Sequence, residues 1–259
     1  MTSFALPEEH PDDPARTVLV VPHAGGGSAA ANPLRAALPD DWLVAGVVFG
    51  GRESRFLDEP PARLTDLVDD TVAAAAEAAE LTGATPVLLG QCSGALVAWL
   101  ASIELARRGR PAPALVVVSR SAPAWPGDLP DATASDGDFL RQVIDLGGVP
   151  EEVVALPGLI DLLLPSLRAD FTALAEWLPE RADPAAVSPT PALALHAPDD
   201  PGCPVESVAA WRGCVAALDL APVKGGHLLL ATNPAGVAAR LTAWLPETAP
   251  EGNRRAGNV

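Results

Sequence analysis

The stretch Thr85-Pro-Val-Leu-Leu-Gly-Gln-Cys-Ser-Gly-Ala95 decides the fold of this chain of 259 residues. An apolar segment leads into a Gly-x-Cys-x-Gly turn, and residues 93–108 behind the turn are apolar almost all round. This order predicts a strand, a tight turn and a helix, in which Gly90 and Gly94 permit close packing and Cys92 projects outward as a nucleophile. A free cysteine is as often a buried core residue, so other residues must decide between the two interpretations.

Ser93 is the competing nucleophile in this turn. A shift of one residue would place Gln91 and Ala95 at the close-packing positions that Gly90 and Gly94 fit, so Cys92 is preferred. The N-terminus of the following helix also favours a thiolate at Cys92 through the helix dipole.

Apolar runs and helical patterns alternate along the chain. Strand-like runs lie at 17–22, 42–49, 86–90, 114–119, 192–197 and 218–223, and helical patterns lie at 64–81, 93–108, 205–218 and 234–245. The alternation predicts an α/β fold with a mostly parallel sheet of about six strands, covered by helices on both faces. Residues 17–245 therefore form one predicted domain, between an N-terminal extension at 1–16 and a tail at 246–259 that is predicted to be disordered.

The alternation stops between residues 121 and 191, where short helical patterns lie at 137–146, 151–156, 159–164 and 166–178. A helical insertion of this kind, at about 124–184, predicts a lid over the site. A helical subdomain without gating is the alternative. The lid's apolar side chains either line a tunnel or pack on one another: Leu140, Ile144, Leu163, Leu167 and Phe171.

Composition excludes several classes of function. The net charge of −16 argues against nucleic acid, which needs a concentrated basic surface. No apolar span reaches 18 residues, so we expect a cytoplasmic protein without membrane contact. Three cysteines (Cys92, Cys203 and Cys214) make no disulfide framework, and no Cys/His cluster has metal-ligand spacing, so no metal is expected.

Nucleophilic catalysis needs a base beside the nucleophile and an acid that orients the base. His227 follows the last strand-like run in Lys224-Gly-Gly-His, where two glycines leave the loop free to turn the ring inward. Asp199-Asp200-Pro201 follows the run at 192–197, at the edge where ligands gather in such sheets. Asp200 is preferred as the acid because it stands beside Pro201. His196 lies inside a strand and is expected to be structural.

An acyl-transfer site also needs backbone amides that hold the oxyanion. The expected donors are the amide of Ser93 and an amide of the glycine-rich loop Pro22-His-Ala-Gly-Gly-Gly27, from Ala24 or Gly25, with Ala24 as our choice. His23 in the same loop is expected to be structural.

These motifs resemble the α/β-hydrolase architecture, whose nucleophile elbow is the strand, turn and helix around Cys92. From Val18 to Leu245 the chain resembles type II thioesterases of polyketide and nonribosomal peptide pathways. The resemblance is carried by Pro22-His-Ala-Gly-Gly, Gly51-Arg-Glu-Ser-Arg-Phe-Leu-Asp-Glu-Pro-Pro, Leu164-Pro-Ser-Leu-Arg-Ala-Asp-Phe, Asp200-Pro and Gly225-Gly-His. It implies an acyl substrate on the phosphopantetheine arm of an acyl or peptidyl carrier protein, with no further cofactor. Arg52 and Arg55 are candidates to meet that acidic partner, or are simply solvated.

Two residues depart from that family's pattern. Gly50 stands where the family has proline, and Cys92 stands where it has serine. Members with cysteine include Dieckmann cyclases that release chains as tetramic acids or related rings, and this sequence resembles them. An acyl-cysteine stays activated toward an internal carbon nucleophile. The alternatives are an editing thioesterase that hydrolyses stalled acyl groups, an acyltransferase, and a carrier-binding module without catalysis.

Overall fold

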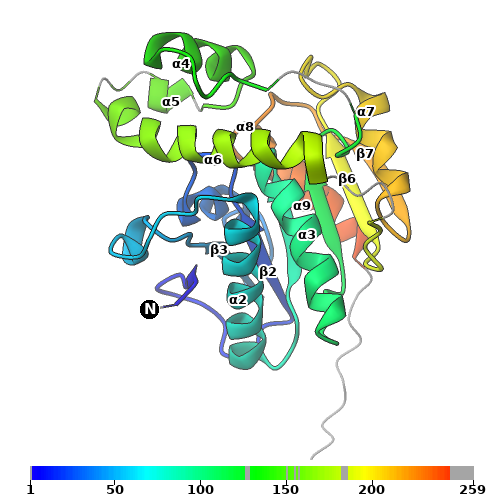
Figure 1. Cartoon of the computed structure of the whole chain (residues 1–259). Coiled ribbons are helices and arrows are strands. Elements are labelled where there is room, and N and C mark those ends of the chain that lie inside the picture. Colours follow the sequence, from blue (N-terminus) through cyan, green and yellow to red (C-terminus); the bar gives the residue numbers. More distant parts are fainter. Residues whose placement is uncertain are drawn as a thin grey trace, which may run out of the picture.

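The chain folds around one sheet in a computed structural model, which describes residues 2–125, 129–149, 151–154, 156, 158–181 and 186–245. Within these residues the strand order is β1-β3-β2-β4-β5-β6-β7, and Figure 1 labels β3, β2, β6 and β7 of this sheet. The strands are Phe4–Ala5 (β1), Arg16–Val21 (β2), Trp42–Val47 (β3), Val87–Gln91 (β4), Leu115–Val118 (β5), Ala192–His196 (β6) and Leu218–Pro222 (β7). The predicted α/β class with a mostly parallel sheet is confirmed.

Strand β1 is additional to the roughly six strands that the sequence predicts. It comes from the N-terminal extension and pairs antiparallel with β3, with Phe4 opposite Val47. All other neighbours in the sheet pair in parallel. Two residues are too short to give a hydrophobic pattern, so the sequence carries no signal for this edge strand.

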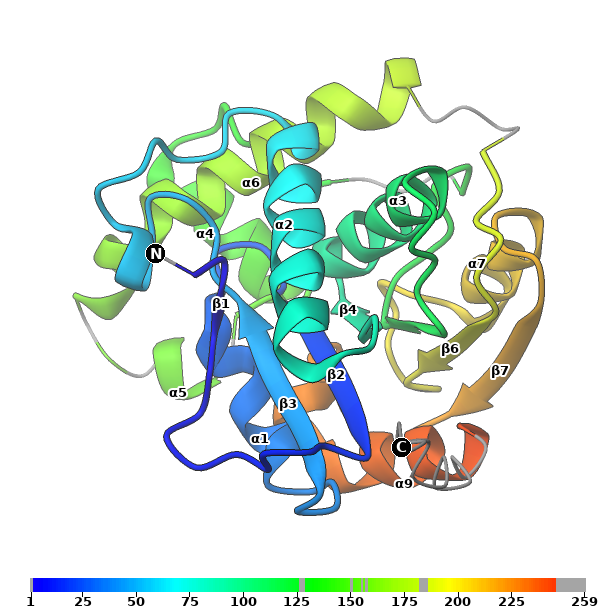
Figure 2. The same ribbon diagram turned by 90° about the horizontal axis from the view of Figure 1, so that it is seen from below.

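Both faces of the sheet are buried. Leu19 and Val21 of β2 pack into one apolar cluster, and Val18 and Val20 pack into the other. Helices α2 (Leu64–Thr82) and α3 (Ser93–Arg107) cover the first face. Helices α1 (Asn32–Arg35), α8 (Leu229–Thr232) and α9 (Pro234–Trp244) cover the second. Figure 2 shows α2 and α3 on one side of the sheet and α1 and α9 on the other. Burial on both faces explains why the strands read as continuous apolar runs.

Between β5 and β6 the chain forms α4 (Asp136–Asp145), α5 (Glu151–Val154) and α6 (Leu159–Arg181). Helix α6 crosses one end of α2 and α3, with α4 and α5 beyond it (Figure 1). The sequence predicts two helices separated at Pro165, whereas α6 continues through this proline. The buried side chains of Leu167, Phe171 and Leu174 join the core on one face of α6, and this burial outweighs the hydrogen bond that proline removes.

One further difference lies after β6. The helix predicted at 205–218 is only α7 (Val205–Ala209), continued by a short 3-10 turn over Ala210–Gly213. The tail at 246–259 lies outside the described residues. Within the part of the chain that the structure describes, no helix is long and apolar enough to cross a membrane.

Candidate active site

Cys92 stands at the apex of the turn between β4 and α3. Its backbone has φ 55° and ψ −124°, a conformation that residues with a Cβ rarely adopt. The amide of Cys92 donates to the carbonyl of Val118 at 2.9 Å, and its carbonyl accepts from the amide of Ala95 at 3.1 Å. Such a conformation costs about 1–3 kcal/mol and persists only where its surroundings enforce it.

The two glycines of the turn have no room for a side chain. A Cβ on Gly90 would lie 2.2 Å from the carbonyl oxygen of Gly94, and a Cβ on Gly94 would lie 2.3 Å from that of Pro22. The close approach of Gly94 to Pro22 brings the glycine-rich loop at 22–28 against the elbow. The Gly-x-Cys-x-Gly pattern therefore fits Cys92 at the apex and leaves no space for the alternative shifted to Ser93.

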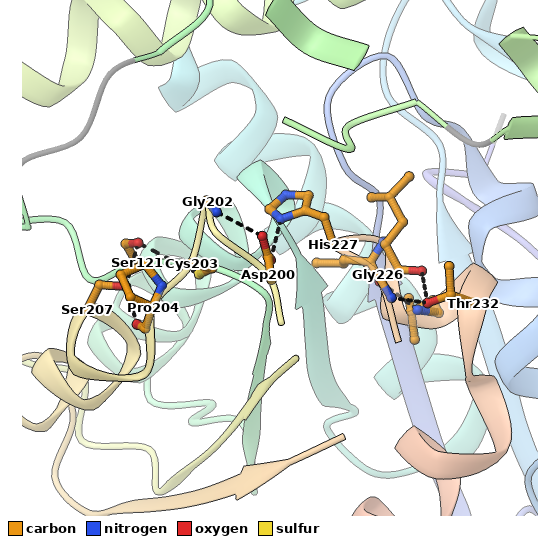
Figure 3. Close-up of polar contacts among 12 residues, drawn as sticks. Ser121, Asp200, Gly202, Cys203, Pro204, Ser207, Gly226, His227 and Thr232 are labelled. Atoms are coloured by element: carbon orange, nitrogen blue, oxygen red, sulfur yellow. Dashed lines mark hydrogen bonds and ion pairs between the residues drawn. The ribbon is translucent and has the colours of Figure 1, made fainter. Parts of the chain in front are cut away.

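Asp200 and His227 meet at the carboxyl ends of β6 and β7. The His227 Nδ1 atom lies 2.7 Å from Asp200 Oδ2, and the amide of Gly202 donates to Asp200 Oδ1 at 3.0 Å (Figure 3). Both side chains are buried, whereas Asp199 is exposed. The structure thus brings together the two residues that the sequence selects as acid and base.

Cys92 and His227 are electrostatically coupled. Burial raises the pKa of the Cys92 thiol, but His227 and, more weakly, Arg120 hold it below its ordinary value. Burial lowers the pKa of His227, yet the charge of Cys92 and the hydrogen bond with Asp200 raise it to about 10. The buried Nε2 atom of His227 has no hydrogen bond of normal geometry in the described part of the chain. The Cys92 sulfur therefore acts on it as a neighbouring charge, which favours a thiolate and imidazolium pair.

The glycine-rich loop follows β2, and its amides have different partners. The amide of Gly25 donates to Asp170 Oδ2 at 2.8 Å, so it is committed inside the protein. The amide of Ala24 makes no such bond among the described residues, which favours Ala24 over Gly25 as the donor. On the other side of the elbow, the amide of Ser93 interacts with the Cys92 sulfur.

Asp170 on α6 holds this loop in place, a role that the sequence does not reveal. Its carboxylate accepts from Arg52 Nη2 at 2.5 Å as well as from Gly25, and Arg52 Nη1 donates to the carbonyl of Gly26 at 2.9 Å. The Asp170 side chain is 5% exposed and that of Arg52 10%. Burial raises the pKa of Asp170, and Arg52 and the Gly25 amide oppose this effect. One buried ion pair thus links helix α6 to the loop beside Cys92.

Neither Arg52 nor Arg55 is a free surface arginine. Arg55 is 15% exposed and pairs with Asp58 at 2.8 Å and with Asp70 at 2.7 Å. The sequence leaves open whether these arginines meet an acidic partner or are solvated, and the structure shows both guanidinium groups paired within the chain.

The cavities nearest the elbow among the described residues differ in their lining. An apolar cavity of about 250 Å³ is lined by the loop at 23–27 and by lid side chains that include Leu140, Leu163 and Leu167. A second cavity of about 70 Å³ has a mixed lining, with Cys92, His227, Ser119 and Arg120 beside apolar residues such as Leu129 and Leu146. We call it the polar cavity because its lining is more polar than that of the first. The site can therefore hold an apolar chain in the first cavity and a small polar group in the second.

Two of the five expected lining residues do not reach the apolar cavity. Phe171 is 2% exposed and packs edge to face on Phe139 at 5.8 Å within the core. Ile144 lies on the surface of α4. The spacing of apolar residues in these helices predicts which side chains share a face. It does not predict whether that face meets the core, the cavity or solvent.

The remaining histidine and cysteines of this region are not positioned as nucleophile or base. Burial and the charges of His227 and Arg52 lower the pKa of His23 to about 4, so its ring is neutral at pH 7. Burial raises the pKa of Cys203 to about 12 and that of Cys214 above its ordinary value. No cluster suited to a metal ion is found in the described ranges.

A cysteine at the turn after β4, an aspartate after β6 and a histidine after β7, on a mostly parallel sheet, match the arrangement of an α/β hydrolase. Residues 16–245 match the family of thioesterase domains, and this chain belongs to that family.

Several similar proteins are thioesterases, and some of them are named for biosynthetic pathways. AngT of Vibrio anguillarum, described as a probable anguibactin biosynthesis thioesterase, is 26% identical over 235 residues, covering 89% of this chain and 92% of AngT. The thioesterase PikA5 of Streptomyces venezuelae is 30% identical over 224 residues, covering 85% and 78%. The structure of RedJ, a thioesterase of the prodiginine pathway in Streptomyces coelicolor, gives a TM-score of 0.78 at 30% identity, covering 93% and 96%. YbtT, a type II thioesterase of the yersiniabactin pathway, gives 0.77 at 26%, covering 93% and 96%.

Proposed function

We propose that this thioesterase takes an acyl chain from the phosphopantetheine thioester of a carrier protein onto Cys92 and releases it by Dieckmann cyclisation, as a tetramic acid or a related ring. Relatives such as AngT and YbtT, named for biosynthetic pathways of this kind, support a carrier-bound substrate. The observation that carries the proposal is Cys92 beside His227 at the position where such enzymes ordinarily hold serine.

In the acylation step, the Cys92 thiolate attacks the thioester carbonyl and forms a tetrahedral oxyanion. The amides of Ala24 and Ser93 are the proposed donors to this oxygen, each worth about 3–4 kcal/mol in comparable sites. The bond to the pantetheine sulfur breaks, and the imidazolium of His227 protonates the leaving thiolate. Asp200 keeps the ring oriented through its 2.7 Å contact with Nδ1. The step ends with an acyl-Cys92 thioester and a neutral His227.

In the release step, neutral His227 removes a proton from an acidic carbon of the bound chain. The resulting enolate carbon attacks the acyl carbonyl, a ring closes, and the bond to Cys92 breaks to regenerate the thiolate and imidazolium pair. Thioester exchange keeps the acyl group activated until this attack, whereas a serine would form a more stable oxygen ester. The apolar cavity of about 250 Å³ provides a water-poor space in which the chain folds back.

Hydrolysis is the second candidate function. The relatives that carry the name thioesterase favour it, with water in place of the carbon nucleophile. The two functions share the acyl-Cys92 intermediate and differ only in what attacks it.

The test uses a 3-oxoacyl-aminoacyl pantetheine thioester with the wild-type chain, Cys92→Ser and Cys92→Ala. Intact mass follows the acyl-enzyme, and chromatography with mass detection follows the products. Cys214→Ser is the matched control, because this half-buried thiol lies outside the site.

Cyclisation predicts a ring product from the wild-type chain and from Cys214→Ser. It predicts no product from Cys92→Ala and mainly free acid from Cys92→Ser. Free acid alone from the wild-type chain would establish hydrolysis instead. Absence of any adduct on Cys92 would refute the covalent mechanism for both candidates.

A further inference from the structure

The polar cavity contains two side chains that the reaction has so far not used. Ser119 and Arg120 follow β5 and line this cavity together with Cys92 and His227. Ser119 is fully buried and adopts φ 49°, in the left-handed region. Its amide donates to the carbonyl of Leu195 at 2.9 Å. A strained, buried serine beside a nucleophile is typical of a functional site.

Both side chains present a buried polar atom without a partner. The Oγ atom of Ser119 and the Nε atom of Arg120 make no hydrogen bond within the described residues. Their neighbour Ser121 differs, because its hydroxyl donates to Ser207 at 2.8 Å (Figure 3). A buried polar atom left unpaired costs about 1–3 kcal/mol, so such atoms ordinarily have a partner.

The chemistry of these atoms defines the partner. The guanidinium group of Arg120 only donates hydrogen bonds, and the Ser119 hydroxyl can donate as well. A ligand must therefore supply an oxygen acceptor, and a negative charge on that oxygen strengthens both bonds. The cavity of about 70 Å³ admits only a small group of this kind.

The polar cavity adjoins the apolar one at the turn that follows α4. Leu146 lines the polar cavity and Gly148 lines the apolar one, with Gly147 between them. A Cβ on Gly147 would lie 3.0 Å from the Cβ of His227, so this turn packs directly on the catalytic ring. A chain attached to Cys92 can therefore place a polar group and an apolar tail on adjacent sides of His227.

We propose that Ser119 and Arg120 bind the 3-oxo oxygen of the acyl chain and thereby select 1,3-dicarbonyl substrates. This inference rests on the proposed function. When His227 removes the proton between the two carbonyl groups, the electron pair moves onto the 3-oxo oxygen, where both donors hold it. Attack by the carbon returns the electron pair, and the bond to Cys92 breaks. The donors thus favour formation of the enolate and not only binding of the chain.

The test compares two pantetheine thioesters that differ only in the 3-oxo group, 3-oxoacyl-aminoacyl and acyl-aminoacyl. Intact mass gives the second-order rate of Cys92 acylation for each thioester, and the ratio of the two rates is the readout. The variants are Arg120→Met, Arg120→Lys and Ser119→Ala, with Arg212→Gln as the control at an exposed arginine. A substitution that acts only through the charge near Cys92 changes the two acylation rates by the same factor, so the ratio of the rates stays unchanged.

We expect the wild-type chain to prefer the 3-oxo thioester. Arg120→Met should reduce the ratio about 10- to 100-fold and Ser119→Ala about 3- to 10-fold, as for loss of a charged and a neutral hydrogen bond. Arg120→Lys, which removes the Nε donor but keeps a charge, decides the outcome if Arg120→Met does not fold. An equal ratio in all variants overturns the inference and leaves the proposed function standing. Absence of Cys92 acylation by either thioester overturns both.

Discussion

Replacement of Asp170 by alanine tests the link between the lid and the loop beside Cys92. The change leaves Arg52 buried without its counter-ion, which costs about 3–5 kcal/mol, and leaves the Gly25 amide without its acceptor, which costs about 1–3 kcal/mol. Relaxation of the Arg52 side chain toward solvent recovers part of this, so we expect the free energy of unfolding to fall by about 4 kcal/mol. Urea unfolding at pH 7.5 measures the loss, and Asp161→Ala, an exposed position on α6, should change it by less than about 0.5 kcal/mol.

The double variant Arg52→Met, Asp170→Leu separates charge from geometry. It removes both ions, so most of the lost stability should return. The Gly25 amide lacks its acceptor in both Asp170→Ala and the double variant, so Cys92 acylation should be slower than in the wild-type chain in both. A loss below about 1 kcal/mol in Asp170→Ala, or wild-type acylation in the double variant, would refute the assigned role of this ion pair.

Three further predictions concern the nucleophile, the loop and the elbow. Thiolate absorbance should place the pKa of Cys92 below the ordinary value of a thiol in the wild-type chain and above that value in His227→Ala, because burial alone favours the thiol; equal values in both would contradict the coupling. Unfolded His23 binds a proton near pH 6.5 and folded His23 only near pH 4, so stability should be full above pH 6.5 and fall by up to about 3 kcal/mol toward pH 4. His23→Gln should flatten this dependence in urea titrations, and an unchanged slope would assign it to other groups. Gly94→Ala should lower the free energy of unfolding by more than about 2 kcal/mol, whereas Gly137→Ala, where a Cβ meets nothing within 4 Å, should leave thermal unfolding nearly unchanged.

The sequence predicts those parts of the site that depend on local order. Cys92, Asp200 and His227 each follow a strand, and the parallel sheet brings the ends of its strands to one edge. Their meeting therefore follows from the strand pattern and the chain order alone. The glycines of the elbow carry similar information, because a Cβ added at Gly90 would lie 2.2 Å from a backbone oxygen and every other residue is thereby excluded.

The parts of the site that the sequence does not predict depend on contacts between segments that are distant in the chain. Arg52 and Asp170 lie 118 residues apart and meet only when α6 packs over the loop. The pattern around Arg52 shows an arginine in a loop and gives no sign of its burial. The same holds for Ser119 and Arg120. The sequence places both residues at the end of a strand, but it does not show that each has a buried polar atom without a hydrogen-bond partner.

The bond from Gly25 to Asp170 has a consequence for redesign of the enzyme. Transplanting the lid of another thioesterase, in order to admit a different chain, would also exchange the group that anchors the oxyanion loop. A chimera must therefore keep an aspartate at this place on α6, and Arg52 with it. Leu140 and Leu163 line the apolar cavity without taking part in this anchor, so substitutions there can change its shape. On α6, the position of Asp170 is thus fixed by the loop that it anchors, whereas the position of Leu163 on the same helix is open to redesign.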